Sequence, residues 1–240
     1  MQLIQNLPPH VLVIPDGNGR WAEKRGLSRS EGHHEGVKRF REISKTAFDL
    51  GIPHFTFWAA SVDNLVKRNP MEIKVLVSLF RHEIEDRNTR DSFIKNQVRF
   101  RVIGKWHEIL GDNKLLDSIQ LLQDRTREFN KHFLTIFFGY CGESEVDEAE
   151  RIIYRQQPKH LNPGFFREAL WTRDLIPVDL VIRTAAEKTN WTHNSAGILN
   201  PWLTPDSQIF SPRILWPDFL PDIFRQTVID YSKITRRFGA

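Results

Sequence analysis

The chain has 240 residues, and its 34 lysines and arginines nearly balance 30 aspartates and glutamates, giving a net charge of +4. This length is ample for one hydrophobic core, so we expect a single domain over residues 1–240. Because no dense basic run of the kind found in nucleic-acid-binding tails is present, we expect no nucleic acid partner. The modest basic excess suits an anionic small molecule instead.

Short apolar segments alternate with longer amphipathic segments along the chain. The predicted strands are His10–Ile14, His54–Ala59, Val98–Ile103, Phe133–Phe138, Val178–Ile182 and, as the weakest of them, Gln208–Phe210. The predicted helices are Gly19–Lys24, Glu31–Leu50, Glu72–Asn88, Lys114–Asn130, Ser144–Gln156, Phe165–Trp171 and Pro221–Arg236. This alternation, with strands that are apolar throughout, predicts an α/β fold with a central, mostly parallel six-stranded sheet flanked by helices.

The cysteine content and the apolar runs bear on where the protein works. Cys141 is the single cysteine, so an intrachain disulfide and a cysteine-rich zinc site are both excluded, which favours a reducing compartment. The first ten residues lack the features of a signal peptide, and no apolar run approaches the roughly 18–20 residues of a membrane span. We therefore expect a cytoplasmic protein, whose contact with membranes would be peripheral.

Polar residues follow several of the predicted strands. In open α/β sheets, ligands bind at the carboxyl ends of the strands. The segments at this edge are Asp16–Arg20, Ala60–Arg68, Gly139–Glu143 and Arg183–Ser195. The last of these begins the least regular region of the chain, residues 184–217, which is a candidate functional loop. We expect the site where these segments meet.

The segment Pro15–Trp21, PDGNGRW, allows three interpretations. Asp-Gly and Asn-Gly pairs are strong turn formers, so it could be no more than a turn. Residues 17–22 also match the dinucleotide fingerprint G-x-G-x-x-A. That fingerprint requires an acidic residue at the end of the second strand, about 20 residues further on, but here the second predicted strand ends near Ala59. The third interpretation is a diphosphate site, in which N–H groups of the turn face the anion and Asp16 holds Mg²⁺ against it.

Electrostatics favours the diphosphate interpretation with a metal ion. Two unit charges 4 Å apart interact by about 4 kcal/mol at an effective dielectric constant near 20, so Asp16 alone would repel a diphosphate on that scale. A divalent cation between them reverses the sign. Arg20, Arg29 and His33 stand nearby as phosphate donors, although each alone would be taken for a surface residue. The chain has no Walker A, G-x-S-x-G or H-E-x-x-H motif, which disfavours P-loop, hydrolase and zinc-protease chemistry.

The segment DGNGRW at residues 16–21, followed by Arg29 and by GHHEG at 32–36, resembles the first motif of the cis-prenyltransferases. This isoprenyl transferase family includes undecaprenyl diphosphate synthase. Further segments are similar to later motifs of the family and occur in the family order: ASVDN at 60–64, GYCGE at 139–143, DLVIRT with a following glutamate at 179–187, and ILWPDF at 214–219. On these motifs the chain is identified as a member of the family.

The resemblance implies an enzyme with a single-domain cis-prenyltransferase fold, usually a homodimer. Such enzymes use Mg²⁺ and condense an allylic prenyl diphosphate with isopentenyl diphosphate in cis geometry. By resemblance, Asp16 binds the metal, and the substrate-binding positions are Gly17, Gly19, Arg20, Trp21, Arg29, His33 and Arg183, with Arg183 on the isopentenyl diphosphate. The implied catalytic positions are Asp16, Asn18 in proton removal, and Ser61 and Asn64 beside the reacting centre.

The chemistry of these residue types agrees with that reaction. Cleavage of the allylic C–O bond leaves a carbocation and a diphosphate, which a metal ion, N–H groups and arginines stabilise. The growing chain needs an apolar tunnel, which the aromatic-rich strands and residues 75–80 could line. Phe137 or Phe138, if directed inward, would shorten the product. The lipid product would bring the enzyme to a membrane surface.

The second substrate site departs from the family pattern. The second arginine of R-T-x-x-E-x-R-x-S is replaced by His193, ahead of Ser195, at a longer spacing. The metal-binding glutamate eight residues before the tryptophan of L-W-P-D-F is Gln208, a doubtful metal ligand, with Asp206 beside it. Lys188 and His193 in the longer loop could rebuild the site for isopentenyl diphosphate, and we favour this interpretation.

The alternative is an enzyme that ionises an allylic diphosphate without elongating it. Such an enzyme would cyclise the prenyl group, hydrate it or transfer it to another acceptor, as a terpene synthase does. A third hypothesis, a non-catalytic partner subunit, is disfavoured because such a subunit has no need of DGNGRW. Product length, stereochemistry and the preferred allylic primer do not follow from the sequence.

Overall fold

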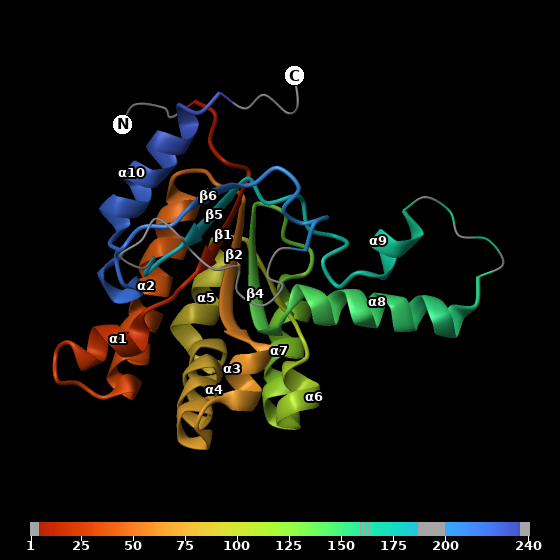
Figure 1. Cartoon of the computed structure of the whole chain (residues 1–240), viewed down its shortest axis with the longest axis horizontal. Coiled ribbons are helices and arrows are strands. Elements are labelled where there is room, and N and C mark those ends of the chain that lie inside the picture. The colour runs from red at the N-terminus through yellow and green to blue at the C-terminus, as the bar shows by residue number, and fades with distance from the viewer. Residues whose placement is uncertain (1–4, 159, 161, 163, 187–199, 236–240) are drawn as a thin grey trace.

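A computed structural model describes residues 5–158, 160, 162, 164–186 and 200–235. The strands are β1 (His10–Ile14), β2 (His54–Ser61), β3 (Val98–Ile103), β4 (His132–Tyr140), β5 (Leu180–Arg183) and β6 (Gln208–Phe210). They form one sheet in the order β3-β4-β2-β1-β5-β6, and every neighbouring pair is parallel. The predicted six-stranded α/β architecture is confirmed (Figure 1).

The helices fill the connections between these strands. The described helices are α1 (Asn18–Glu23), α2 (Arg29–Asp49), α3 (Val62–Lys67), α4 (Pro70–Glu85), α5 (Arg87–Lys95), α6 (Trp106–Leu110), α7 (Asn113–Thr126), α8 (Gly142–Gln156), α9 (Phe165–Ala169) and α10 (Pro221–Ser232), and a 3₁₀ turn, η1, covers Trp216–Asp218. None of them combines the length and apolarity that crossing a bilayer requires.

One predicted helix, Glu72–Asn88, is wrong, because the structure divides this segment into α4 and α5. The break lies at Asp86, whose backbone is extended (φ −61°, ψ 125°). The Asp86 carboxylate accepts a hydrogen bond from the Thr89 N–H at 2.8 Å and so begins the second helix. The break was not predicted because the sequence alone does not distinguish an aspartate that caps a new helix from one on a helix surface.

Other predicted boundaries also move. The predicted strand Val178–Ile182 is wrong at its start, because the Val178 N–H donates to the Leu203 carbonyl rather than to the sheet. The predicted helices Lys114–Asn130, Phe165–Trp171 and Pro221–Arg236 continue past the observed ends of α7, α9 and α10. The short helices α3, α5 and α6 were not predicted, because fewer than three turns give little periodicity.

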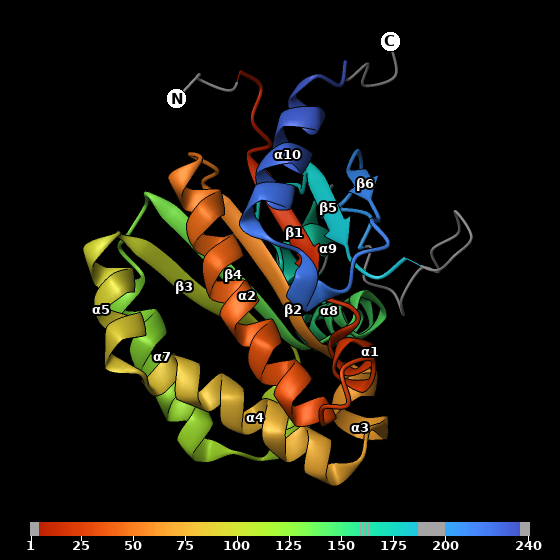
Figure 2. The same cartoon turned by 90° about the vertical axis from the view of Figure 1, so that its left-hand side faces the viewer.

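The sheet separates two apolar layers. In β1, Val11 and Val13 belong to the core beneath α2, α4, α7 and α10, whereas Leu12 and Ile14 point into a smaller cluster on the other face. Figure 2 shows α2 in front of β4 and along β2, with α10 in front of β1 and α4 at the lower end of α2. Burial on both faces explains why the central strands are apolar throughout. The functional pocket lies in the first layer, between α2, α4 and the sheet.

Candidate active site

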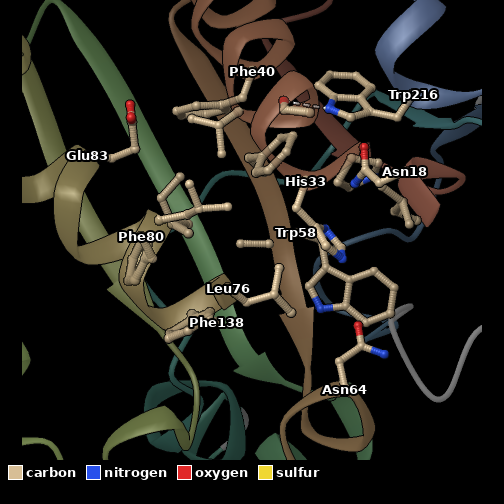
Figure 3. Close-up of a pocket in the computed structure, with 18 of the residues that line it drawn as sticks. Asn18, His33, Phe40, Trp58, Asn64, Leu76, Phe80, Glu83, Phe138 and Trp216 are labelled. Atoms are coloured by element: carbon tan, nitrogen blue, oxygen red, sulfur yellow. Dashed lines mark hydrogen bonds between the residues drawn. The ribbon is translucent and has the colours of Figure 1, made fainter. Parts of the chain in front are cut away.

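A cavity of about 470 Å³ opens at the carboxyl edge of the sheet and extends beneath α2 and α4. Polar side chains line one end: Asp16, Asn18, His33, Ser61, Asp63, Asn64, Arg68 and Arg183. Apolar side chains line most of the rest, among them Phe40, Phe57, Leu76, Phe80, Leu134, Ile136 and Phe138. Figure 3 shows this division, with Asn18 and Asn64 at one end and Phe80 and Glu83 toward the other. The shape suits an elongated molecule with one polar end.

Asp16 is held at the polar end by its own backbone. Its carbonyl accepts hydrogen bonds from the Trp216 N–H at 3.0 Å and from the Thr184 hydroxyl at 2.8 Å. The carboxylate lies 3.0 Å from the Arg20 guanidinium and 3.5 Å from that of Arg183. Two arginines therefore converge on one carboxylate at the ends of β1 and β5.

Gly17 makes the turn after β1 possible. Its φ of 106° is in the left-handed region, and a Cβ there would lie 2.8 Å from the Leu215 side chain. Gly17 is the N-cap residue of α1 and has no side-chain cap among the described residues. The first N–H groups of the helix are thus left for water or a ligand.

Asn18 carries an acceptor that the described part of the chain does not satisfy. Its Oδ1 is buried and has no hydrogen-bond partner there. The backbone of α2 approaches so closely that a Cβ on Gly36 would lie 2.5 Å from this oxygen, and one on Gly32 would lie 2.3 Å from the Asn18 carbonyl. The two glycines of GHHEG therefore let α1 and α2 touch and aim the Asn18 amide into the pocket.

Glu72, at the start of α4, gathers a second group of donors. Its carboxylate accepts from Arg68 at 2.7 Å and from His33 Nε2 at 3.1 Å, and Arg29 lies 3.8 Å away. Burial lowers the pKa of His33, an effect that Glu72 only partly offsets. The imidazole is therefore neutral at pH 7, and Nε2 carries the proton because the carboxylate can only accept.

Glu72 is itself ionised at neutral pH. Partial burial alone would raise the pKa of Glu72, but the His33 hydrogen bond and the Arg68 charge lower it below its usual value. Sequence reasoning placed Arg68 in a segment at the predicted site but missed its partner Glu72. A glutamate and an arginine four residues apart look like an ordinary surface pair of a helix.

Ser61 and Asn64 form a reciprocal cap at the start of α3. The Asn64 N–H donates to the Ser61 hydroxyl oxygen at 3.0 Å, and the Ser61 N–H donates to Asn64 Oδ1 at 3.3 Å. Both residues also line the pocket. Because Oδ1 of Asn64 is occupied by the cap, its amide nitrogen is the group left to contact a ligand.

The donor set at the polar end fits one kind of metal site. In the part of the chain that the structure describes, no three His, Cys, Asp or Glu side chains are grouped to hold an ion by themselves. Two carboxylates line the polar end: Asp63 pairs with Lys67 at 2.9 Å, whereas Asp16 lies at the turn after β1. One carboxylate combined with phosphate oxygens and water is a usual environment for Mg²⁺, so the residues fit a metal shared with a bound diphosphate.

Comparison with known proteins identifies the family. The family model described as "Putative undecaprenyl diphosphate synthase" matches residues 14–239. The chain belongs to this family. The isoprenyl transferase of Fusobacterium nucleatum is 34% identical over 98% of this chain and 97% of its own length, and that of Thermotoga maritima is 33% identical over 97% of each. The predicted cis-prenyltransferase membership and enzymatic character are confirmed.

Solved structures of similar proteins agree. Lavandulyl diphosphate synthase from Lavandula x intermedia, in complex with dimethylallyl diphosphate, superimposes with a TM-score of 0.84 at 26% identity, covering 98% of this chain and 99% of that one. A probable undecaprenyl diphosphate synthase from Campylobacter jejuni has a TM-score of 0.76 at 21% identity, covering 98% and 100%. The second likeness supports the fold alone.

The pocket of this cis-prenyltransferase brings together only some of the predicted site residues. Asp16, Asn18, His33, Ser61, Asn64 and Arg183 line it. Gly17, Gly19, Arg20 and Arg29 lie around its mouth through the contacts above, with Arg29 packed 3.6 Å from the position that a Gly19 Cβ would take. Of the two phenylalanines considered for an inward position, Phe138 lines the cavity, whereas Phe137 stacks on Tyr140 at 3.9 Å on the other face of the sheet.

Trp21 and Gln208 are placed elsewhere. The Trp21 indole donates to Asp218 at 2.7 Å and lies beneath Arg25, so it joins α1 to η1 outside the pocket lining. Gln208 begins β6 opposite Leu180, near the amino end of the strands, whereas Asp16 follows their carboxyl ends. His193 and Ser195, with Lys188, lie outside the described residues.

Proposed function

We propose that this cis-prenyltransferase condenses an allylic prenyl diphosphate with isopentenyl diphosphate in cis geometry. The observation that carries the proposal is a single cavity with arginines around Asp16 at its mouth and an aromatic interior. A diphosphate needs the first part, and a prenyl chain needs the second. Four arginines, Arg20, Arg29, Arg68 and Arg183, lie around this mouth as donors for phosphate oxygens.

The allylic diphosphate is expected to lie along the turn after β1. The free N–H groups of α1, Arg20 and the donors gathered by Glu72 would bind its phosphate oxygens. Mg²⁺ held by Asp16 would supply charge neutralisation of the leaving diphosphate. As the C–O bond breaks, these groups stabilise the negative charge that develops on the leaving oxygen.

The acceptor alkene is expected beside Ser61, Asn64 and Arg183. Its carbon–carbon bond forms with the allylic carbon, and a proton must then leave the neighbouring carbon so that a double bond is restored. The buried Asn18 Oδ1, which has no partner among the described residues, is positioned to take part in that proton removal. Arg183 would bind the diphosphate of the acceptor.

We further infer that residues 1–240 form one catalytic domain that works as a homodimer. Residues that line the cavity lie between Ile14 and Phe138 and at Arg183 and Trp216, so segments far apart in the chain build one pocket. The family resemblance favours the dimer. Asp206 and Gln208 remain candidates for a further metal contact, with Gln208 the doubtful one because of its place on β6.

One observation favours a second candidate function. The structural relative from Lavandula makes lavandulyl diphosphate and was solved with dimethylallyl diphosphate, which is itself an allylic diphosphate. The altered positions at His193 and Gln208 agree with an acceptor other than isopentenyl diphosphate. In that case the enzyme would ionise the allylic diphosphate and cyclise, hydrate or transfer the prenyl group.

One assay separates the two functions. The purified enzyme is incubated with Mg²⁺ and farnesyl diphosphate, with and without labelled isopentenyl diphosphate, and products are separated by chain length. We expect labelled products longer than the primer. Consumption of farnesyl diphosphate at the same rate without isopentenyl diphosphate, and without label in the product, would reject elongation and support the second function.

A further inference from the structure

The apolar cavity has a charged group in its wall at the end away from the diphosphate site. Glu83 of α4 lines the cavity, and its side chain is only 12% exposed. Arg41 of α2 binds it with both arms of the guanidinium, through Nε at 2.7 Å and through a second, shorter contact. In Figure 3, Glu83 lies beyond Phe40 and Phe80 as seen from Asn64.

This pair is the second of two polar ties between α2 and α4. At the mouth, His33 of α2 contacts Glu72 of α4, and at the far end Arg41 contacts Glu83. Between residues 72 and 83, α4 advances about 16 Å at about 1.5 Å per residue. Apolar residues of both helices, including Phe40 and Phe80, face the cavity between the ties. The two helices therefore enclose an apolar chamber with a polar closure at each end.

We propose that the Arg41–Glu83 pair, together with the aromatic residues beside it, closes this chamber and limits the prenyl chain to about 15–20 carbons. This inference rests on the proposed function for its substrate class. Benzene fills a cavity of about 150 Å³, or about 25 Å³ per carbon, so the 470 Å³ cavity, whose polar end also receives the diphosphate, holds at most about 19 carbons. The pair is a specificity determinant and touches no reacting atom.

Desolvation explains why a longer chain stops at the pair. A chain end that passed between α2 and α4 would have to separate Glu83 from Arg41 and leave a buried carboxylate against hydrocarbon, which is unfavourable. The hydrogen bonds to Glu83 raise the pKa of Arg41 above its usual value, so the guanidinium stays charged. On the side of α5 and β3, stacked Phe93 and Phe100, with ring centres 5.7 Å apart, complete the end wall.

The test measures chain-length selection by binding as well as by turnover. The enzyme is titrated in the presence of Mg²⁺ with farnesyl diphosphate, which has 15 carbons, or with geranylfarnesyl diphosphate, which has 25. Binding is followed by tryptophan fluorescence, to which Trp58 and Trp216 in the cavity wall contribute. We expect the 15-carbon ligand to bind the unaltered enzyme at least about tenfold more tightly, since overpacking a filled cavity is unfavourable. In Glu83→Ala the ratio should fall to about threefold or less, and products made with isopentenyl diphosphate should lengthen by at least one five-carbon unit.

Two further variants serve as comparisons. Glu83→Gln keeps the volume and a hydrogen bond to Arg41 and should retain most of the selection. Arg81→Ala breaks an ion pair between α4 and Asp112 that lies outside the cavity lining, and it should leave the ratio unchanged. Arg41→Ala opens the same closure from α2 and replaces Glu83→Ala if that variant does not fold.

The outcomes distinguish the closure from the proposed elongation activity. If the unaltered enzyme binds both ligands equally, or if the folded opening variants keep its ratio, the closure is rejected. If the ratio changes as expected but no isopentenyl diphosphate is incorporated, the closure stands and elongation is rejected. If neither ligand binds, both proposals are rejected.

Discussion

His10 at the amino edge of the sheet and Asn18 at its carboxyl edge both bury polar atoms, but their hydrogen bonding differs. At the amino edge, His10 is 1% exposed, and its ring nitrogens contact the Ile176 carbonyl and the Thr56 hydroxyl, each at 2.8 Å. At the carboxyl edge, Asn18 Oδ1 has no partner in the described chain, and Asp16 attracts two arginines. Buried polar groups that hydrogen-bond to one another stabilise the fold, whereas an unpartnered acceptor in a pocket lining points to a ligand.

The largest effect should come from the carboxyl edge. Asp16→Ala removes the carboxylate proposed to hold the metal, so we expect turnover to fall by about 10³-fold, as on removal of a main charge-stabilising group. The melting temperature should stay within a few degrees, because the Arg20 pair is exposed and the contact to the buried Arg183 is long, at 3.5 Å. The measurement is steady-state turnover beside a thermal melt. Asp49→Ala, on the exposed end of α2, is the control; unchanged turnover in Asp16→Ala would reject the metal assignment.

The amino edge should instead control stability. Burial, partly offset by the Ile176 carbonyl, lowers the pKa of His10 from 6.5 to about 4, with His54 adding to the shift. The folded pKa is thus below the unfolded one, so this contribution is present above pH 6.5 and lost as pH falls toward 4. At about 1.4 kcal/mol per pKa unit it amounts to about 3 kcal/mol.

His10→Gln tests this contribution. Denaturant unfolding between pH 4.5 and 6.5 should show a shallower loss of stability in the variant than in the unaltered protein, because the variant lacks the titration of His10. Some loss should remain in both proteins, because both keep His54 and His33. Turnover per folded molecule at pH 7 should be the same in both proteins. Parallel pH profiles of unfolding would contradict the role assigned to His10.

Gly36→Ala should affect both turnover and stability. Alanine usually stabilises a helix interior relative to glycine, by about 1 kcal/mol. Here its Cβ would lie 2.5 Å from Asn18 Oδ1, so the asparagine must move. A displacement of about 1 Å at a reacting group costs about 10²-fold, and we expect kcat to fall by that factor. Retained kcat in a folded variant would show that the Asn18 position is not critical.

Trp21→Phe should have the smallest effect. The variant loses the indole hydrogen bond to Asp218, which costs about 1 kcal/mol of unfolding free energy. Turnover should change by less than about twofold, since the side chain does not line the pocket and only one partly buried hydrogen bond is lost. A large rise in KM for the allylic diphosphate would instead favour the substrate-binding role implied by family resemblance.

The sequence predicted the sheet better than the pocket, for physical reasons. Strands buried on both faces are uniformly apolar, so all six were found within a few residues of their observed positions. The turn at Gly17 was found because its glycines and Asp16 lie together in the chain. The Arg41–Glu83 pair joins positions 42 residues apart. Each residue, taken singly, resembles an ordinary helix-surface charge, and only the packing of α2 beside α4 reveals the pair.

Because of the glycine contact between α1 and α2, the α2 wall of the chamber should not tolerate substitution at the two glycines, whereas the facing wall should. Any side chain at Gly32 or Gly36 would drive α2 into the backbone or amide of Asn18. The facing wall on α4 and β4 is built from side chains such as Phe80 and Phe138, which can be exchanged without moving a backbone. Laboratory selection for altered product length should therefore collect substitutions on α4 and β4, while both α2 glycines persist.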